Sequence, residues 1–266
     1  MKKEESYYID AHCHIDGYGD EKIEEIVKDA EEKGVKVIIN NGVNKEVNRK
    51  VLELSEKYDV IKAALGIYPM EALSMKDSEI DAEINFIRKN KNKIICVGEV
   101  GMDFKEDIEI AGKEKKDIKG IRERQKKTFE KFIKLSIELD KPIQIHSRKA
   151  EFECIDVLEK MNAKKVIMHC FNGNFNLVKR IADNKWYITI PTNVTFSEHF
   201  QKIIRETDID RLLCETDSPF LHPRKEMNNV PGNIIESYKK IAKIKGLELD
   251  EVKKKIMQNY ANLFGL

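Results

Sequence analysis

The chain has 266 residues, of which 41% are hydrophobic and 36% are charged, and its formal net charge is +1. This near-neutral charge excludes a polycation that binds nucleic acid by its overall charge, so such binding needs a local basic patch. No segment approaches the roughly 18 consecutive apolar residues of a membrane-spanning helix, and the charged N-terminus shows no secretory signal. We therefore expect a cytoplasmic protein without a membrane partner.

Short apolar runs alternate with amphipathic segments along the chain. The runs are rich in Ile and Val and mostly apolar on both faces, as in parallel strands that are buried on two sides. In chain order, the predicted strands are residues 7–13, 35–42, 61–67, 94–100, 142–147, 165–171, 185–190 and 211–217. The amphipathic segments that predict helices are residues 20–34, 45–59, 123–140, 152–163, 174–184 and 197–208.

The alternation predicts one α/β domain over residues 1–266. We count eight strand–helix units without a Pro-, Gly- or Ser-rich linker, which favours a single (β/α)8 TIM barrel. Residues 249–266 predict an extra C-terminal helix. A doubly wound open sheet is the alternative, although it usually needs fewer strands. The connection over residues 102–123 is unusually long, and such a loop is either a functional lid or an insertion.

Histidines and carboxylates follow the ends of several predicted strands. Side chains two positions apart on a strand share a face, so Asp10, His12 and His14 of "DAHCHID" point the same way. An HxH pair alone is a weak sign of a metal site, because hydrogen-bonded core histidines explain it about as often. The other strands end in Glu99, His146, His169, Glu215 and Asp217. Barrel enzymes place their sites at the C-terminal ends of strands, so we expect these residues to meet there.

Imidazole nitrogens combined with carboxylates suit Zn, Mn, Fe or Co better than Ca. One ion would leave several candidate ligands unused, whereas two ions that share Glu99 would use the whole set. Two-metal sites activate water and stabilise both the attacking and the leaving oxygen, so the predicted chemistry is hydrolysis. Strand alternation directs Cys13, Cys170 and Cys214 away from the ligands, and we expect these reduced thiols to pack as small apolar side chains.

The segments "DAHCHID", "GIYP", "GEVGMDF", "HCFNG", "ETDSPFL" and "NLFGL" run in this order across nearly the whole chain. Together they resemble the TatD family of metal-dependent deoxyribonucleases, which belongs to the amidohydrolase-like barrels. The resemblance implies a metal-dependent hydrolase of DNA phosphodiesters, with 3′-to-5′ exonuclease activity on single-stranded DNA or 3′ ends. It also implies two divalent ions, which we expect to be Zn, Mn, Mg, Fe or Co.

The resemblance also implies roles for single residues. His12 and His14 would bind one metal, with Asp217 as a further ligand. His146 and His169 would bind the second metal, and Glu99 would bridge the two ions. Asp217 would also act as the general base, and Glu215 would orient water or ligands.

Four further residues are candidates for substrate contacts. Arg148 can match two phosphate oxygens with its guanidinium, and a structural salt bridge is the alternative role for it. Asn172 and Asn193 lie on loops that follow predicted strands. In "GIYP" the chain has Tyr68 where the family commonly has His. Tyrosine can donate a hydrogen bond to phosphate but is a poorer proton carrier at neutral pH.

The segment "KEKKDIKGIRERQKK", residues 113–127, is a candidate basic patch for DNA, with a solvated helix face as the alternative. Two other functions stay open, since a fold and its metals do not fix the substrate. One is an amide, lactone or small phosphoester hydrolase on the same metal site. The other is a metal-binding partner protein without catalytic activity.

Overall fold

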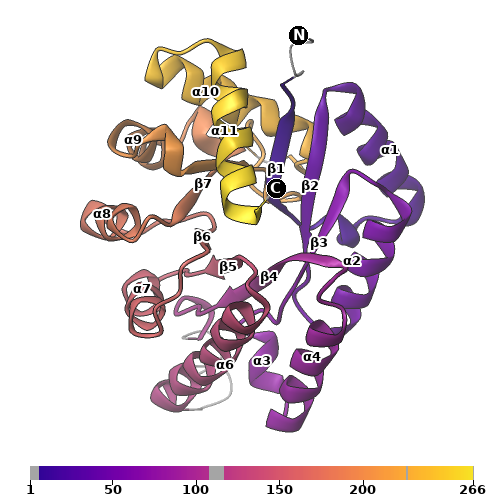
Figure 1. Ribbon diagram of the computed structural model, residues 1–266, viewed down its shortest axis with the longest axis vertical. Helices are drawn as coiled ribbons and strands as arrows, with labels where there is room; N and C mark the ends of the chain where they lie inside the picture. Colours follow the sequence, from indigo (N-terminus) through magenta and orange to yellow (C-terminus); the bar gives the residue numbers. More distant parts are fainter. Residues whose placement is uncertain (1–5, 108–116, 226, 266) are drawn as a thin grey trace. The chain divides into compact units, whose positions relative to one another are not determined.

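The computed structural model describes residues 6–107, 117–225 and 227–265. Parallel strands and helices alternate along the chain (Figure 1). The chain forms two compact units. We call residues Met1–Asn40, Leu54–Lys62 and Tyr187–Leu266 the first unit, and residues Asn41–Glu53 and Ala63–Trp186 the second unit.

The first unit contains the beginning and the end of the chain. Its elements are β1 (Tyr8–Cys13), α1 (Asp20–Glu32), β7 (Tyr187–Pro191), α9 (Glu198–Glu206), β8 (Leu212–Glu215), α10 (Ile235–Lys245) and α11 (Leu249–Phe264). Short 3-10 helices span Ile15–Gly17, Thr192–Thr195, Ile209–Arg211 and Pro231–Ile234. Three elements contribute residues to both units: β2 (Val35–Asn41), α2 (Lys45–Lys57) and β3 (Ile61–Leu65).

The second unit contains the middle of the chain. Its elements are α3 (Glu71–Ser74), α4 (Asp77–Lys89), β4 (Ile94–Gly101), α6 (Ile118–Leu139), β5 (Ile143–His146), α7 (Glu151–Lys160), β6 (Val166–Met168) and α8 (Phe175–Asp183). In this unit β3 pairs with β4, β4 with β5, and β5 with β6, always in parallel. The strands therefore follow one another in the sheet in chain order.

In the first unit the first and last strands of the chain lie side by side. β1 pairs in parallel with β2, and β7 pairs in parallel with β8. Beyond the strand ends, the Asp217 amide donates to the His12 carbonyl at 2.9 Å, and the His14 amide donates to the Ser218 carbonyl at 2.8 Å. Adjacent first and last strands are expected of a closed barrel rather than of an open doubly wound sheet.

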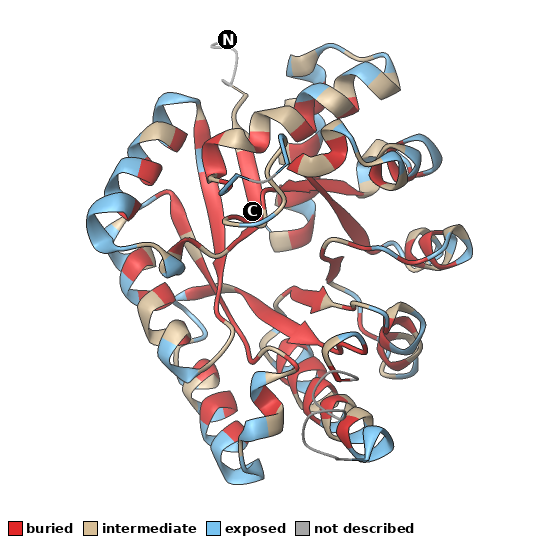
Figure 2. Cartoon of the chain, turned by 180° about the vertical axis from the view of Figure 1, so that it is seen from behind, coloured by how far each residue is buried: buried red, intermediate tan, exposed pale blue. Residues whose placement is uncertain are grey.

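The strands are almost entirely buried, whereas each helix has one buried and one exposed side (Figure 2). In α1, Ile23, Ile26, Val27 and Ala30 form the buried stripe that the sequence predicted. The helix ends before Gly34, whose φ of +81° is a left-handed conformation that glycine adopts easily. No helix within the described residues is long and apolar enough to cross a membrane.

The structure corrects several predicted boundaries. α6 begins five residues earlier than predicted, because the Asp117 carboxylate caps it by accepting the amides of Lys119 and Gly120. β6 ends at Met168, three residues earlier than predicted. α4 and α10 were absent from the predicted helices, although both bury an apolar stripe. Residues 108–116 of the predicted long connection lie outside the described residues.

Candidate metal centre

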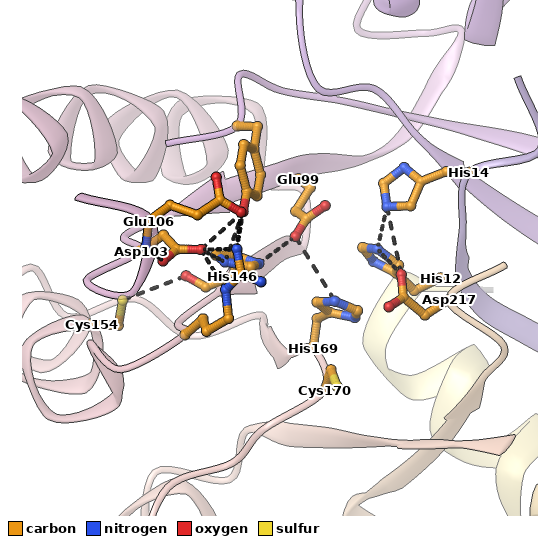
Figure 3. Close-up of polar contacts among 12 residues, drawn as sticks. His12, His14, Glu99, Asp103, Glu106, His146, Cys154, His169, Cys170 and Asp217 are labelled. Carbon is orange, nitrogen blue, oxygen red and sulfur yellow. Dashed lines mark hydrogen bonds and ion pairs between the residues drawn. The ribbon is translucent and has the colours of Figure 1, made fainter. Parts of the chain in front are cut away.

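In the first unit, two histidines and an aspartate converge at the ends of β1 and β8 (Figure 3). The Nε2 atoms of His12 and His14 lie 3.0 Å apart. The Asp217 Oδ1 atom lies 3.7 Å from each of these nitrogens. Two nitrogens that bind one ion at about 2.1 Å lie roughly 3.0 to 3.4 Å apart, so the histidine pair has the spacing of a chelate.

Backbone hydrogen bonds hold Asp217 beside the histidine pair. Its amide donates to the His12 carbonyl, and the next residue, Ser218, accepts from the His14 amide. Asp217 itself has φ of +52°, a left-handed conformation that Asp tolerates better than most residues. The chain therefore turns directly after β8 and keeps the carboxylate at the end of β1.

Asp10, which strand alternation predicted on the same face as the histidines, has a different role. Its fully buried carboxylate accepts from the Thr216 amide at 2.8 Å and from the Thr216 hydroxyl at 2.5 Å. Burial raises its pKa to about 8, although the hydrogen bonds from Thr216 act in the opposite direction. Asp10 braces β8 against β1, and in this way it supports the neighbouring Asp217 turn.

In the second unit, Glu99, His146 and His169 form a further group (Figure 3). The Glu99 Oε1 atom lies 2.8 Å from His146 Nδ1 and 3.9 Å from His169 Nε2. One ligand atom from each of the three residues lies within 4.8 Å of the other two, so they could hold a metal ion. This group, like the one in the first unit, offers two imidazole nitrogens and a carboxylate. Such donors fit a divalent ion of the Zn, Mn, Fe or Co type.

Two glycines bring β4 close enough to β5 for Glu99 and His146 to meet. A Cβ atom on Gly98 would lie 2.8 Å from the Gln144 Cβ, and one on Gly101 would lie 1.9 Å from the His146 carbonyl oxygen. Gly101 also has φ of +146°, which strains any other residue. The glycines of "GEVG" are therefore needed for close strand packing beside the candidate metal-binding residues.

We expect Gly101→Ala to lower the free energy of unfolding by about 2 to 4 kcal/mol, because the new methyl group must displace the His146 backbone. Urea denaturation measures the change. Gly246→Ala is the matched control, since Gly246 has φ of +66° but open space around its Cβ position. This control should cost only about 1 kcal/mol. Equal losses in the two variants would contradict the packing argument.

The second unit also contains a buried carboxylate that the sequence reasoning missed. The Asp103 Oδ2 atom lies 2.9 Å from His146 Nε2, and it accepts from the Tyr68 hydroxyl at 3.0 Å and from Arg148 Nε at 2.7 Å. Its Oδ1 atom accepts the amides of Lys105 and Glu106. Burial alone would raise the Asp103 pKa, but the hydrogen bonds from His146, Glu106 and Arg148 hold it well below its usual range.

The pairing with Asp103 fixes how His146 presents its ring. The Asp103 carboxylate accepts a hydrogen bond from the Nε2–H group, which leaves Nδ1 directed toward Glu99. A carboxylate on the far nitrogen of a metal-binding histidine sets its tautomer and increases its basicity. Asp103 is therefore a positioning residue for this group.

A family model described as TatD related DNase matches residues 9–265 of the chain. The chain belongs to this family. The protein named uncharacterized metal-dependent hydrolase MJ1582, from Methanocaldococcus jannaschii, is 34% identical over 258 residues, which cover 97% of this chain and 96% of that protein. Deoxyribonuclease TATDN3 from Homo sapiens is 28% identical over 264 residues, which cover 96% of this chain and 94% of that protein.

The chain is also similar to a solved structure. YJJV, a TatD homolog from Escherichia coli K12, matches with a TM-score of 0.86 and 23% identity, over 97% of this chain and 98% of that one. The predicted (β/α)8 TIM barrel is confirmed, and the open-sheet alternative is wrong. The predicted family is confirmed too, and this TatD-family chain is a metal-dependent hydrolase that acts on ester bonds.

Two residues predicted to contact substrate in this TatD chain already have protein partners. The Arg148 guanidinium pairs with Asp103 and with Glu106, which favours the salt-bridge alternative for this residue. Tyr68, which replaces the common family histidine, donates to Asp103 and accepts from Arg148 at 3.2 Å. Burial, followed by the charges of Asp103 and Glu99, raises the Tyr68 pKa, so its hydroxyl stays protonated. Tyr68 therefore acts as a hydrogen-bond donor within this network.

The remaining predicted residues differ in burial. Glu215 is fully buried at the end of β8. Asn172 is exposed and donates to the Cys170 carbonyl at 2.8 Å. Asn193 has a buried Oδ1 atom without a hydrogen-bond partner among the described residues.

The cysteines beside the candidate ligands of the TatD site differ from one another. Cys13 and Cys214 are fully buried, as predicted for packing. Cys170 is half-buried and has φ of +42° beyond the end of β6, so the predicted strand alternation does not apply to it. None of the five cysteines, all of which the structure describes, forms a disulfide.

Proposed function

We propose that this hydrolase cleaves phosphodiester bonds in single-stranded DNA from the 3′ end, with two divalent ions. The observation that carries the proposal is the pair of three-residue groups, each with two imidazole nitrogens and one carboxylate. One group would hold one ion through His12, His14 and Asp217. The other would hold an ion through Glu99, His146 and His169. The name deoxyribonuclease given to the human relative TATDN3 supports DNA as the substrate.

The ions would supply positive charge for the phosphate oxygens and would lower the pKa of a water molecule. Proton transfer and the orientation of water depend on the protein's own side chains. The Asp217 carboxylate, 3.7 Å from two imidazole nitrogens, accepts the proton of the attacking water as a general base. Glu215, buried two residues before Asp217, orients that water or a ligand side chain. The bridging position of Glu99 between two ions stays a prediction.

Substrate contacts follow from the surroundings of these groups. Asn193 stays a candidate, because its buried Oδ1 atom has no hydrogen-bond partner among the described residues. Arg148, Tyr68 and Asn172 stay candidates, although each makes hydrogen bonds within the protein. Of the predicted basic segment, residues 113–116 lie outside the described residues. Arg122 and Arg124 pair with Asp107 and Asp77, so these two arginines support the helix-surface alternative for the segment.

Two further proposals concern the whole chain. The family model spans nearly all of it, which supports a single hydrolase domain over residues 1–266. The lack of disulfides among the cysteines supports a cytoplasmic location.

The test is incubation of the purified protein with end-labelled single-stranded oligonucleotides in the presence of Mg, Mn or Zn. Stepwise shortening from the 3′ end is expected, and chelation by EDTA should abolish it. A substrate whose terminal 3′ linkages are phosphorothioates is the matched control and should resist cleavage. Absence of cleavage with every metal, together with turnover of an amide, lactone or small phosphoester, would favour the alternative hydrolase and reject the nuclease. If nothing is hydrolysed but metal binds, the non-catalytic alternative is favoured.

A further inference from the structure

The two loops that follow β7 and β8 in the first unit expose large apolar side chains. Phe196 is 43% exposed, Phe220 is 60% exposed and Met227 is 58% exposed. Most large apolar side chains of the described residues are buried. Three exposed ones on two neighbouring loops therefore mark a candidate binding surface. We call Phe196, Phe220, Lys225 and Met227 the aromatic platform.

Side-chain hydrogen bonds tie the two loops together. The Thr192 hydroxyl donates to the Leu221 carbonyl at 2.7 Å, and the Thr195 hydroxyl donates to the Pro223 carbonyl at 2.6 Å. Asn229, fully buried, donates to the Thr192 hydroxyl and to the Thr216 carbonyl at 2.9 and 2.7 Å. The exposed rings therefore stand on braced backbone, which lowers the entropy that binding would cost.

Positive charge accompanies the exposed rings. The Lys225 ammonium group lies 5.1 Å from the centroid of the Phe196 ring, within the range of a cation–π contact. Arg224, the preceding residue, is exposed as well. An aromatic face beside cationic side chains is complementary to a base and its phosphate.

The platform lies close to the candidate metal ligands of the first unit. The Phe220 amide donates to the Asp217 carbonyl at 2.8 Å, so only one turn separates the exposed ring from this carboxylate. A strand whose phosphodiester reaches Asp217 can place a neighbouring base at Phe220. A protein partner is a poorer match, because the platform has only four residues. A stable protein interface takes about 20 to 30 residues from each side.

We propose that the aromatic platform stacks unpaired bases of single-stranded DNA beside the scissile phosphodiester. The proposal rests on the proposed nuclease function and adds the residues that select a single strand. Phe196 and Phe220 supply faces for stacking, while Lys225 and Arg224 contact the flanking phosphates. Duplex DNA, whose bases are already stacked and paired, cannot use these faces.

The test measures oligonucleotide binding by fluorescence anisotropy in EDTA, where cleavage cannot interfere. The double variant Phe196→Ala/Phe220→Ala is expected to raise the Kd for a single-stranded oligonucleotide about 5- to 100-fold. An abasic oligonucleotide of equal length keeps the phosphates but lacks the bases, and the double variant and the wild type should bind it with the same Kd. The single variant Phe220→Trp, in which Phe196 is unchanged, keeps an aromatic face at both positions. It should bind the single-stranded oligonucleotide with nearly the wild-type Kd.

Ile137→Ala is the matched control, because Ile137 is an apolar side chain that is also 50% exposed. It lies near the end of α6, which leads to the amino-terminal end of β5, whereas the platform follows the carboxyl-terminal ends of β7 and β8. This substitution should not change the Kd. The proposal is overturned if the wild type does not bind the base-containing strand more tightly than the abasic one. It is also overturned if the double variant loses affinity equally for both strands or for neither.

Hydrolysis of bis(p-nitrophenyl) phosphate by the wild type with Mn separates this proposal from the nuclease proposal. Turnover of that substrate without any base-dependent binding rejects only the platform. Base-dependent binding by a protein that cleaves no phosphodiester rejects only the nuclease.

Discussion

Replacing Asp217 with Asn is expected to lower kcat for phosphodiester hydrolysis by about 1000-fold, without unfolding the protein. The amide has the shape of the carboxylate but cannot accept a proton from water, and general bases contribute about 10²- to 10⁴-fold to the rate. The fold should persist, because the backbone bond from residue 217 to the His12 carbonyl does not involve the side chain. Asn also tolerates the φ of +52° at this position. Steady-state kinetics with Mn and a thermal unfolding curve measure the two quantities.

Asp140→Asn is the matched control for this substitution. Asp140 also has a positive φ, of 51°, but its side chain is 85% exposed and pairs with Lys165 at the surface. A change from Asp to Asn at such a turn should leave kcat within about twofold of the wild type, because exposed ion pairs contribute little. If Asp217→Asn keeps more than about a tenth of the wild-type kcat, Asp217 is not the general base.

Much of the fold was predictable because it depends on local periodicity. Short apolar runs predicted β1 and β8, and alternation along β1 predicted that His12 and His14 share a face. The helices α4 and α10 follow the same physics, with Ile80, Ile84 and Ile87 at helical spacing on α4. Their periodicity is present in the sequence, so both helices were predictable from it as well.

The surroundings of His146 were harder to predict, because they depend on residues distant in the sequence. Asp103 lies two residues beyond β4, where strand alternation no longer applies. Its partners Tyr68 and Arg148 are 35 and 45 residues away in the chain. Only the folded sheet brings these three together, so the sequence could not decide whether Arg148 contacts phosphate or protein. Asp103 lies within the "GEVGMDF" segment, but nothing local distinguishes it from a surface carboxylate.

Replacing Asp103 with Asn is expected to weaken metal binding by the second unit about 10- to 100-fold, the usual cost of losing a partner of a metal-binding histidine. The Asp103 Oδ2 atom lies 2.9 Å from His146 Nε2 and also accepts from Tyr68 and Arg148. A neutral amide cannot compensate the guanidinium charge of Arg148, and its NH2 group would meet donors wherever it replaced an accepting oxygen. Titration of the metal-free protein with Mn measures the affinity, and kcat at saturating Mn measures any remaining defect.

Glu106→Gln separates a role in positioning His146 from a role in anchoring Arg148. Glu106 pairs with the same guanidinium, and its side chain is 38% exposed. If Asp103 serves His146, Asp103→Asn should lower metal affinity far more than Glu106→Gln, and excess Mn should recover much of kcat. If Asp103 only anchors Arg148, both variants should lose stability while metal affinity stays unchanged. Because a structural brace cannot be rescued by added metal, recovery of activity with Mn distinguishes the two roles even where Asp103→Asn also lowers the free energy of unfolding.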